Sequence, residues 1–224
     1  MSDTSNNAVR LKTFLFEHRF SILLAALLLG MILPGFFYEK AGEQIVWSTT
    51  RTLTVLASIN VVQKLKRFIL AIAVLGFLAV FSDWINQLKW VHEYSGLLGL
   101  ALSSLLLAII TYELFEQLLN MKRITINTIV AAFTGFMLIG AIGFLVFMFV
   151  HLLYPDSFSN IREGELASSD LAYFSYITLL TIGYGDIVPT SIVARGIAMF
   201  LGLVGQFYLV VIMSLLVGKY LSKR

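Results

Sequence analysis

Long apolar runs limit the folds open to this chain of 224 residues. About 20 consecutive apolar residues cross the hydrocarbon core of a bilayer as a helix. Because backbone polar groups in lipid must be bonded within the protein, runs of this length predict an all-α membrane protein with six transmembrane helices. The second run is the least apolar, since it contains Arg51 among several Ser and Thr residues. The six runs are residues 20–37, 45–62, 67–84, 95–113, 128–153 and 190–217.

The composition agrees with a membrane protein. Hydrophobic residues make up 58% of the chain and charged residues 13%, whereas a soluble domain is about half apolar and a quarter charged. Cysteine is absent, which excludes disulfides and thiolate metal sites. The first run also resembles the core of a signal peptide, but no cleavage site of small residues follows it, so we expect an uncleaved helix.

The positions of Lys and Arg predict the orientation, because these residues are retained on the cytoplasmic side. They lie at the ends of apolar runs and not in a patch that would bind nucleic acid. With the N-terminus inside, eleven lie on the inner side and four on the outer side. We therefore expect both termini on the cytoplasmic side of the plasma membrane, or of the inner membrane if the source is bacterial. The inner residues are Arg10, Lys12, Arg19, Lys64, Lys66, Arg67, Lys122, Arg123, Lys219, Lys223 and Arg224, and the outer ones are Lys40, Lys89, Arg162 and Arg195.

The segment 154–189 connects the last two runs and must then face outward. It begins with polar residues and continues with DLAYFSYITLL, which is apolar but too short to cross the bilayer as a helix. This helix must enter the membrane and return. Non-helical backbone at that depth is tolerated only where protein buries it or where it lines a watery path.

The sequence TLLTIGYGDIVP, residues 178–189, follows this short helix. An ion that crosses a membrane must exchange its water for other oxygens, and backbone carbonyls aimed at one axis can supply them. Gly183 and Gly185 can adopt the dihedral angles that this requires. Thr181 can add its hydroxyl at the inner end, and we expect Tyr184 to pack behind the loop. A simple glycine-rich turn is the alternative.

TLLTIGYGD resembles the selectivity-filter signature of potassium channels, with Ile182 in place of the usual valine. The resemblance covers about residues 128–218 as outer helix, turret, pore helix, filter and inner helix. It implies a potassium-selective channel and a homotetramer, because one subunit cannot form the ring of oxygens. The implied filter residues are Thr181, Ile182, Gly183, Tyr184 and Gly185, with K⁺ bound at the first four.

The resemblance also indicates residues around the filter. Asp186 would lie at the outer mouth, and some relatives hold it with a carboxylate at the position that is Ile177 here. Tyr173 is the expected substitute partner. Gly205 matches the hinge glycine of the family's inner helix, and Gly202 is a neighbouring alternative, although close helix packing would explain either glycine equally well.

Leu209, Met213 and Val217 recur every four residues and share one face of a helix. That face either lines the pore or contacts lipid, and the pattern leaves both interpretations open. The expected domains are a cytoplasmic N-terminal segment (1–18), a four-helix peripheral domain (19–113), an amphipathic cytoplasmic linker (114–127), the pore domain (128–218) and a short cytoplasmic tail (219–224).

Six spans with this loop before the last one resemble the layout of voltage-gated channels. Moving one charge across 100 mV supplies about 2.3 kcal/mol toward opening, but the fourth run contains no Arg or Lys. We therefore expect a channel that is not voltage-gated in the usual way. Arg51 would either extend its side chain to the outer surface or pair with Asp83.

Two other classes of function remain as alternatives. A six-span transporter should place ionisable residues near the midplane, and a membrane enzyme should cluster His, Asp or Glu at depth. The runs show almost no such residues, so we expect neither an enzyme nor a cofactor. The remaining alternative, beside the transporter or enzyme, is a weakly selective cation channel with the same fold. The expected partners are K⁺ ions, membrane lipids and further copies of the chain, and not nucleic acid.

Overall fold

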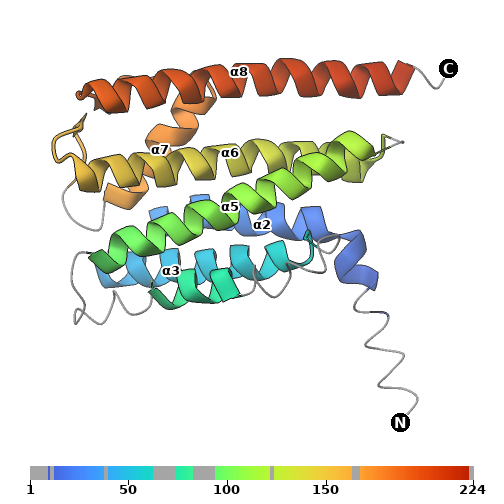
Figure 1. The fold of residues 1–224 in the computed structure, drawn as a ribbon, viewed down its shortest axis with the longest axis horizontal. Coiled ribbons are helices and arrows are strands. Elements are labelled where there is room, and N and C mark those ends of the chain that lie inside the picture. Colours follow the sequence, from blue (N-terminus) through green and yellow to red (C-terminus); the bar gives the residue numbers. More distant parts are fainter. Residues whose placement is uncertain are drawn as a thin grey trace, which may run out of the picture.

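The computed structural model describes residues 10, 13–37, 40–62, 74–82, 94–121, 124–162 and 167–221. Long helices lie side by side, with α8 on one side, α6 and α7 next to it, and α5, α2 and α3 beyond them (Figure 1). Residues 74–82 are helical as well. In chain order the elements are α2 (Arg19–Ile32), η1 (Leu33–Phe36), α3 (Lys40–Ile59), α5 (Tyr94–Asn120), α6 (Ile126–Leu153), β1 (Phe158–Ser159), α7 (Ala167–Leu179), β2 (Val188–Pro189) and α8 (Ile192–Leu221).

Four helices among the described residues are long and apolar enough to cross a membrane. They correspond to the first, fourth, fifth and sixth predicted spans. The predicted second span forms α3, a helix of 20 residues that carries polar side chains. The predicted third span is described only over residues 74–82, so the count of six spans stays a prediction. The four helices are Arg19–Phe36, Leu97–Asn120, Ile126–Leu153 and Ile192–Lys219.

The helix α5 continues beyond the expected end of the fourth span. Ile110, Leu114 and Leu118 are all buried and lie four residues apart, so the same face of the helix stays packed through residue 118. The helix therefore ends at Asn120 and not at the expected residue 113. The start of the predicted linker, residues 114–120, belongs to this helix.

The helix α6 lies at the centre and contacts α2, α5, α7 and α8. It begins with a capping box between Thr125 and Thr128, in which the Thr125 N–H donates to Thr128 Oγ1 at 3.1 Å. A helix that is apolar all round is expected to be surrounded by other elements. Ala131, Leu138 and Phe147 are accordingly inaccessible to solvent.

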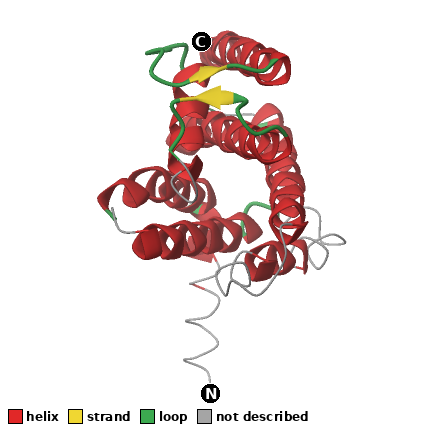
Figure 2. Cartoon of the chain, turned by 90° about the vertical axis from the view of Figure 1, so that its left-hand side faces the viewer, coloured by secondary structure: helices red, strands yellow, loops and turns green. Residues whose placement is uncertain are grey.

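Two short strands join the segments on either side of α7 (Figure 2). Phe158 pairs with Pro189 and Ser159 with Val188 in antiparallel register. The Thr190 N–H extends this connection by donating to Ser157 O at 2.9 Å. The all-α expectation missed this pair, because two residues per strand are too few to produce a periodic pattern in the sequence.

The helix α3 reaches the start of α7. Trp47 Nε1 donates to Ser169 Oγ at 3.3 Å, and the indole ring stacks on Phe144 of α6 at 5.3 Å between centroids. These two contacts join α3 to α6 and α7 of the same chain.

Candidate functional site

The short helix α7 is held against α6 by hydrogen bonds and by a close approach. Ser175 Oγ donates to Gly140 O at 2.7 Å, and the Tyr176 hydroxyl donates to Met137 O at 3.0 Å. A Cβ atom on Gly140 would overlap the ring of Tyr176. The absence of a side chain at Gly140 of α6 therefore makes room for α7. Two backbone carbonyls of α6 then fix the position of α7.

The last turn of α7 also approaches α8 closely. A Cβ atom on Gly205 would clash with the carbonyl oxygen of Leu179, whereas a Cβ atom on Gly202 would lie 3.9 Å from Thr178 O. The helix α8 runs without a break from Ile192 to Leu221. Close packing thus requires glycine at residue 205, and a hinge at that residue stays a prediction.

The loop after α7 has an alternating backbone conformation. Thr181, Gly183 and Gly185 have φ angles of 57°, 56° and 80°. Ile182 and Tyr184, which lie between them, do not have positive φ angles. Carbonyl-lined filters aim successive backbone oxygens at one axis, which requires dihedral angles that glycine adopts readily. Such a row of oxygens can coordinate a cation.

Hydrogen bonds to α7 support the Thr181 end of this loop, which the sequence predicts to be its inner end. The Ile182 N–H donates to Ile177 O at 2.9 Å, and the Thr181 N–H donates to Thr178 O at 3.0 Å. The left-handed conformation costs a residue with a side chain about 1–2 kcal/mol. These bonds at the end of α7 offset that cost at Thr181.

The chain does not cover the loop by itself. Residues 180–186 are all exposed, and Tyr184 is exposed by 72%. Nothing lies within 4 Å of a Cβ atom placed on Gly183 or Gly185. The predicted packing of Tyr184 behind the loop is therefore not made within one chain.

The Asp186 end of the loop, its predicted outer end, is held by hydrogen bonds from two residues. Tyr173 donates its hydroxyl proton to Asp186 Oδ2 at 2.7 Å, which is the predicted partnership. This bond holds the pKa of the Asp186 carboxyl below its ordinary value of 3.8 and raises the pKa of Tyr173 to about 12. Asn160 Nδ2 donates to Asp186 O at 2.8 Å. Sequence reasoning missed Asn160, whose φ of 61° is a conformation that Asn tolerates.

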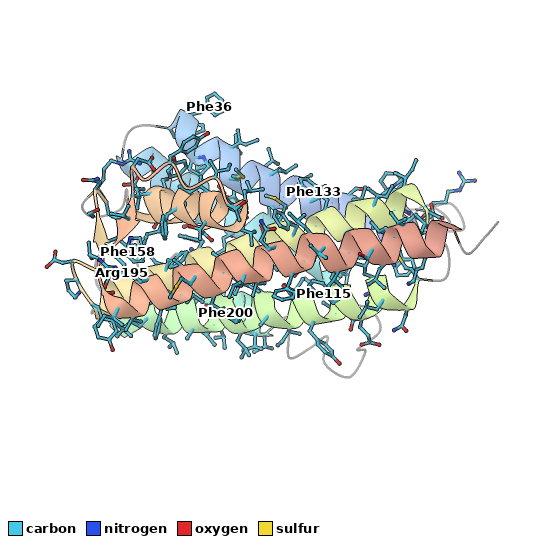
Figure 3. The ribbon with its side chains drawn as sticks, turned by 90° about the horizontal axis from the view of Figure 1, so that it is seen from above. Phe36, Phe115, Phe133, Phe158, Arg195 and Phe200 are labelled. Atoms are coloured by element: carbon cyan, nitrogen blue, oxygen red, sulfur yellow. The ribbon has the colours of Figure 1, made fainter. Side chains whose placement is uncertain are left out.

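Polar contacts also stabilise the segments next to the Asp186 end of the loop. Arg162 and Asp170 form an ion pair with 2.6 Å between Nη2 and Oδ1, which ties the preceding loop to the first turn of α7. Arg195 Nε donates to Pro189 O at 3.1 Å. Figure 3 shows Phe158 and Arg195 close to the same end of the molecule.

The inner end of the loop faces α8. Gln206 Nε2 donates to Thr181 Oγ1 at 3.3 Å, a contact that sequence reasoning missed. Leu209 and Val217 are exposed by 42% and 52%, and the side chain of Met213 lies outside the described residues. These exposures are compatible with either interpretation of that face.

The helices before α6 contain a buried polar network. Glu113 is inaccessible to solvent and accepts a 2.9 Å hydrogen bond from Gln117 Nε2. Gln117 Oε1 in turn accepts a 3.1 Å bond from Arg19 Nη2. The expectation of almost no ionisable groups at depth passed over Glu113, which follows a long apolar run. Among the described residues, no three His, Cys, Asp or Glu side chains are placed to hold a metal ion.

Arg51 of α3 is half-buried and lines a cavity of about 100 Å³ together with Ser103 and Tyr176. It makes an interaction of its own. Asp83, the partner considered for it, lies outside the described residues.

Comparison with known proteins finds similarity to ion channels in the part of the chain that holds the site. Residues 124–222 match the family model described as ion channel. A segment of 65 residues is 35% identical to the two-pore potassium channel 2 of Arabidopsis thaliana, and covers 29% of this chain and 14% of that relative. No solved structure matches the chain significantly. The part that contains α6, α7, the loop and α8 is therefore similar to ion channels.

Proposed function

We propose that four copies of this chain form a potassium-selective channel in a cell membrane, with both termini in the cytoplasm. K⁺ ions bind between the copies to oxygens of residues 181–185. The supporting observation is the loop itself, whose positive φ angles at residues 181, 183 and 185 alternate with two residues that lack them. A filter that aims successive carbonyl oxygens at one axis requires positive φ angles of this kind.

Exposure of the loop supports assembly of several copies. Backbone groups at membrane depth must be bonded or must line a watery path, yet residues 180–186 are uncovered in one chain. Neighbouring copies provide that cover, and a ring of four loops provides enough oxygens to replace the hydration shell of an ion. Phe200, Leu203 and Phe207 on α8 are exposed by 68%, 58% and 68% and supply apolar surface for these contacts.

The helix α7 also favours a cation near the loop. A helix carries about half a negative charge at its C-terminus, and α7 ends at Leu179, two residues before Thr181. Four such helix ends would place negative potential at the inner end of the loop. They attract cations without selecting between K⁺ and Na⁺, so selectivity rests on the carbonyl oxygens.

Voltage does not drive this channel strongly. The helix α5 holds no Lys or Arg over its 27 residues, so it lacks the charges that a membrane potential would move. A steep conductance curve, with several gating charges per subunit, would contradict this proposal.

Ion flux of the purified protein in vesicles tests the function. We expect K⁺ and Rb⁺ to pass, Na⁺ to be excluded and Ba²⁺ to block. Gly183→Ala should abolish selective flux, because alanine disfavours the positive φ of 56°. Gly196→Ala is the matched control, since Gly196 lies in α8 with nothing within 4 Å of an added Cβ atom. Equal Na⁺ and K⁺ flux, or a monomeric protein in native mass spectrometry, would refute the proposal.

A further inference from the structure

Gln206 brings an amide group to the inner end of the loop. Its Nε2 donates to Thr181 Oγ1 at 3.3 Å. The preceding residue, Gly205, allows this approach, because Leu179 O occupies the place that a Cβ atom there would need. Gln206 is itself exposed in the single chain.

The surroundings of Gln206 are apolar. Between Arg195 and Lys219 it is the only residue with an amide or charged side chain, and its exposed neighbours include Leu203, Phe207 and Val210. A polar side chain in a span is costly unless it faces protein or a water-filled path. Its contact with Thr181 places it on the side of α8 that faces the loop, and not on a face turned to lipid.

We propose that Gln206 discriminates against divalent cations by weakening cation binding at the inner end of the filter loop. This inference rests on the proposed channel function. A hydroxyl oxygen has two lone pairs, and the amide hydrogen of Gln206 occupies one of those on Thr181 Oγ1. The same hydrogen places partial positive charge beside the oxygen that would bind the innermost cation.

The consequence depends on the charge of the ion. The energy of a cation in the field of a fixed dipole is proportional to its charge, so a divalent ion is disfavoured twice as strongly as K⁺. Conduction requires binding that is weak enough for the ion to leave. Gln206 therefore shortens the residence of K⁺ at the inner site and opposes block by divalent cations from the cytoplasmic side.

Ba²⁺ is the probe that tests this inference. Bilayer recording measures Ba²⁺ block from the cytoplasmic side, and calorimetry of the purified protein measures K⁺ and Ba²⁺ binding independently of conduction. Gln206→Leu removes the donor at similar volume and should raise Ba²⁺ affinity about tenfold, since it deletes one hydrogen-bond donor in each of the copies around the site. The increase for K⁺ should be smaller. Gln206→Glu replaces the donor by an acceptor and should raise Ba²⁺ affinity further.

Two controls separate this role from a general effect on folding. Ser214→Ala changes another exposed polar residue of α8, about two turns away, and should leave Ba²⁺ affinity unchanged. In a Thr181→Val background, which keeps the shape but lacks the hydroxyl, Gln206→Leu should lose most of its effect.

The outcomes distinguish this inference from the proposed function. A K⁺-selective wild-type protein whose Ba²⁺ affinity is unchanged or reduced by Gln206→Leu would overturn the inference and leave the function intact. An effect that persists in full with Thr181→Val would overturn it too, because Gln206 would then not act through the hydroxyl. Wild-type protein that neither binds nor conducts K⁺ would overturn both.

Discussion

Replacing Gly205 by Ala separates a packing role from a hinge. The added Cβ atom would clash with the backbone oxygen of Leu179 and lie 2.9 Å from the Leu179 Cδ1 atom. Leu179 is completely buried, so it has no free space to move into. Overpacking of this kind costs about 1–3 kcal/mol, and the better helix propensity of alanine returns about 0.5–1 kcal/mol. The midpoints of these two ranges leave a net loss of about 1 kcal/mol per chain.

Thermal unfolding of the purified protein, followed by tryptophan fluorescence, measures this loss. A domain of this size loses about 2–4 °C in Tm per kcal/mol, so Gly205→Ala should unfold several degrees earlier. Gly202→Ala is the matched control, because its nearest atom, Thr178 O, lies at 3.9 Å. That variant should be as stable as the wild type or gain up to about 1 kcal/mol. A Gly205→Ala protein as stable as the control, with slower gating, would refute the packing argument and favour a hinge.

Three further predictions concern α7 and the loop that follows it. Tyr173→Phe removes the 2.7 Å bond to Asp186 and should accelerate current decay in symmetrical K⁺, so an unchanged decay would show that the bond does not support the filter. Because that bond lowers the pKa of Asp186, its stabilising effect is complete above the ordinary pKa and is lost only as pH falls through the lowered value. Conductance should therefore not change between external pH 8 and about 5, and a titration in that range that Asp186→Asn abolishes would contradict this. Ser175→Ala removes the buried 2.7 Å bond to Gly140 O and should cost about 1 kcal/mol in unfolding free energy, whereas an unchanged Tm would disprove its anchoring role.

The spans and the loop are predictable from sequence because their signals are local. The length of an apolar run sets whether a helix can cross a bilayer, and this alone anticipated α6 to within two residues. Gly183 and Gly185 were expected in the left-handed region because few other residues adopt it without strain, and both have positive φ angles. The predicted bond between Tyr173 and Asp186 also required only a short helix and the loop that follows it.

Contacts between distant residues were decided by the tertiary structure. Gln206 meets Thr181 across 25 residues, Asn160 meets Asp186 across 26, and Ser175 meets Gly140 O across 35. Apolar periodicity indicates that a helix face is buried but not which residue packs against it. The sequence therefore could not show whether Gly205 is a hinge or a site of close packing between helices. The chain by itself thus determined which described helices are long and apolar enough to cross a membrane and where the backbone can bend. Packing of α6, α7 and α8 against one another decided which side chains surround the loop, because those distances depend on all three helices at once.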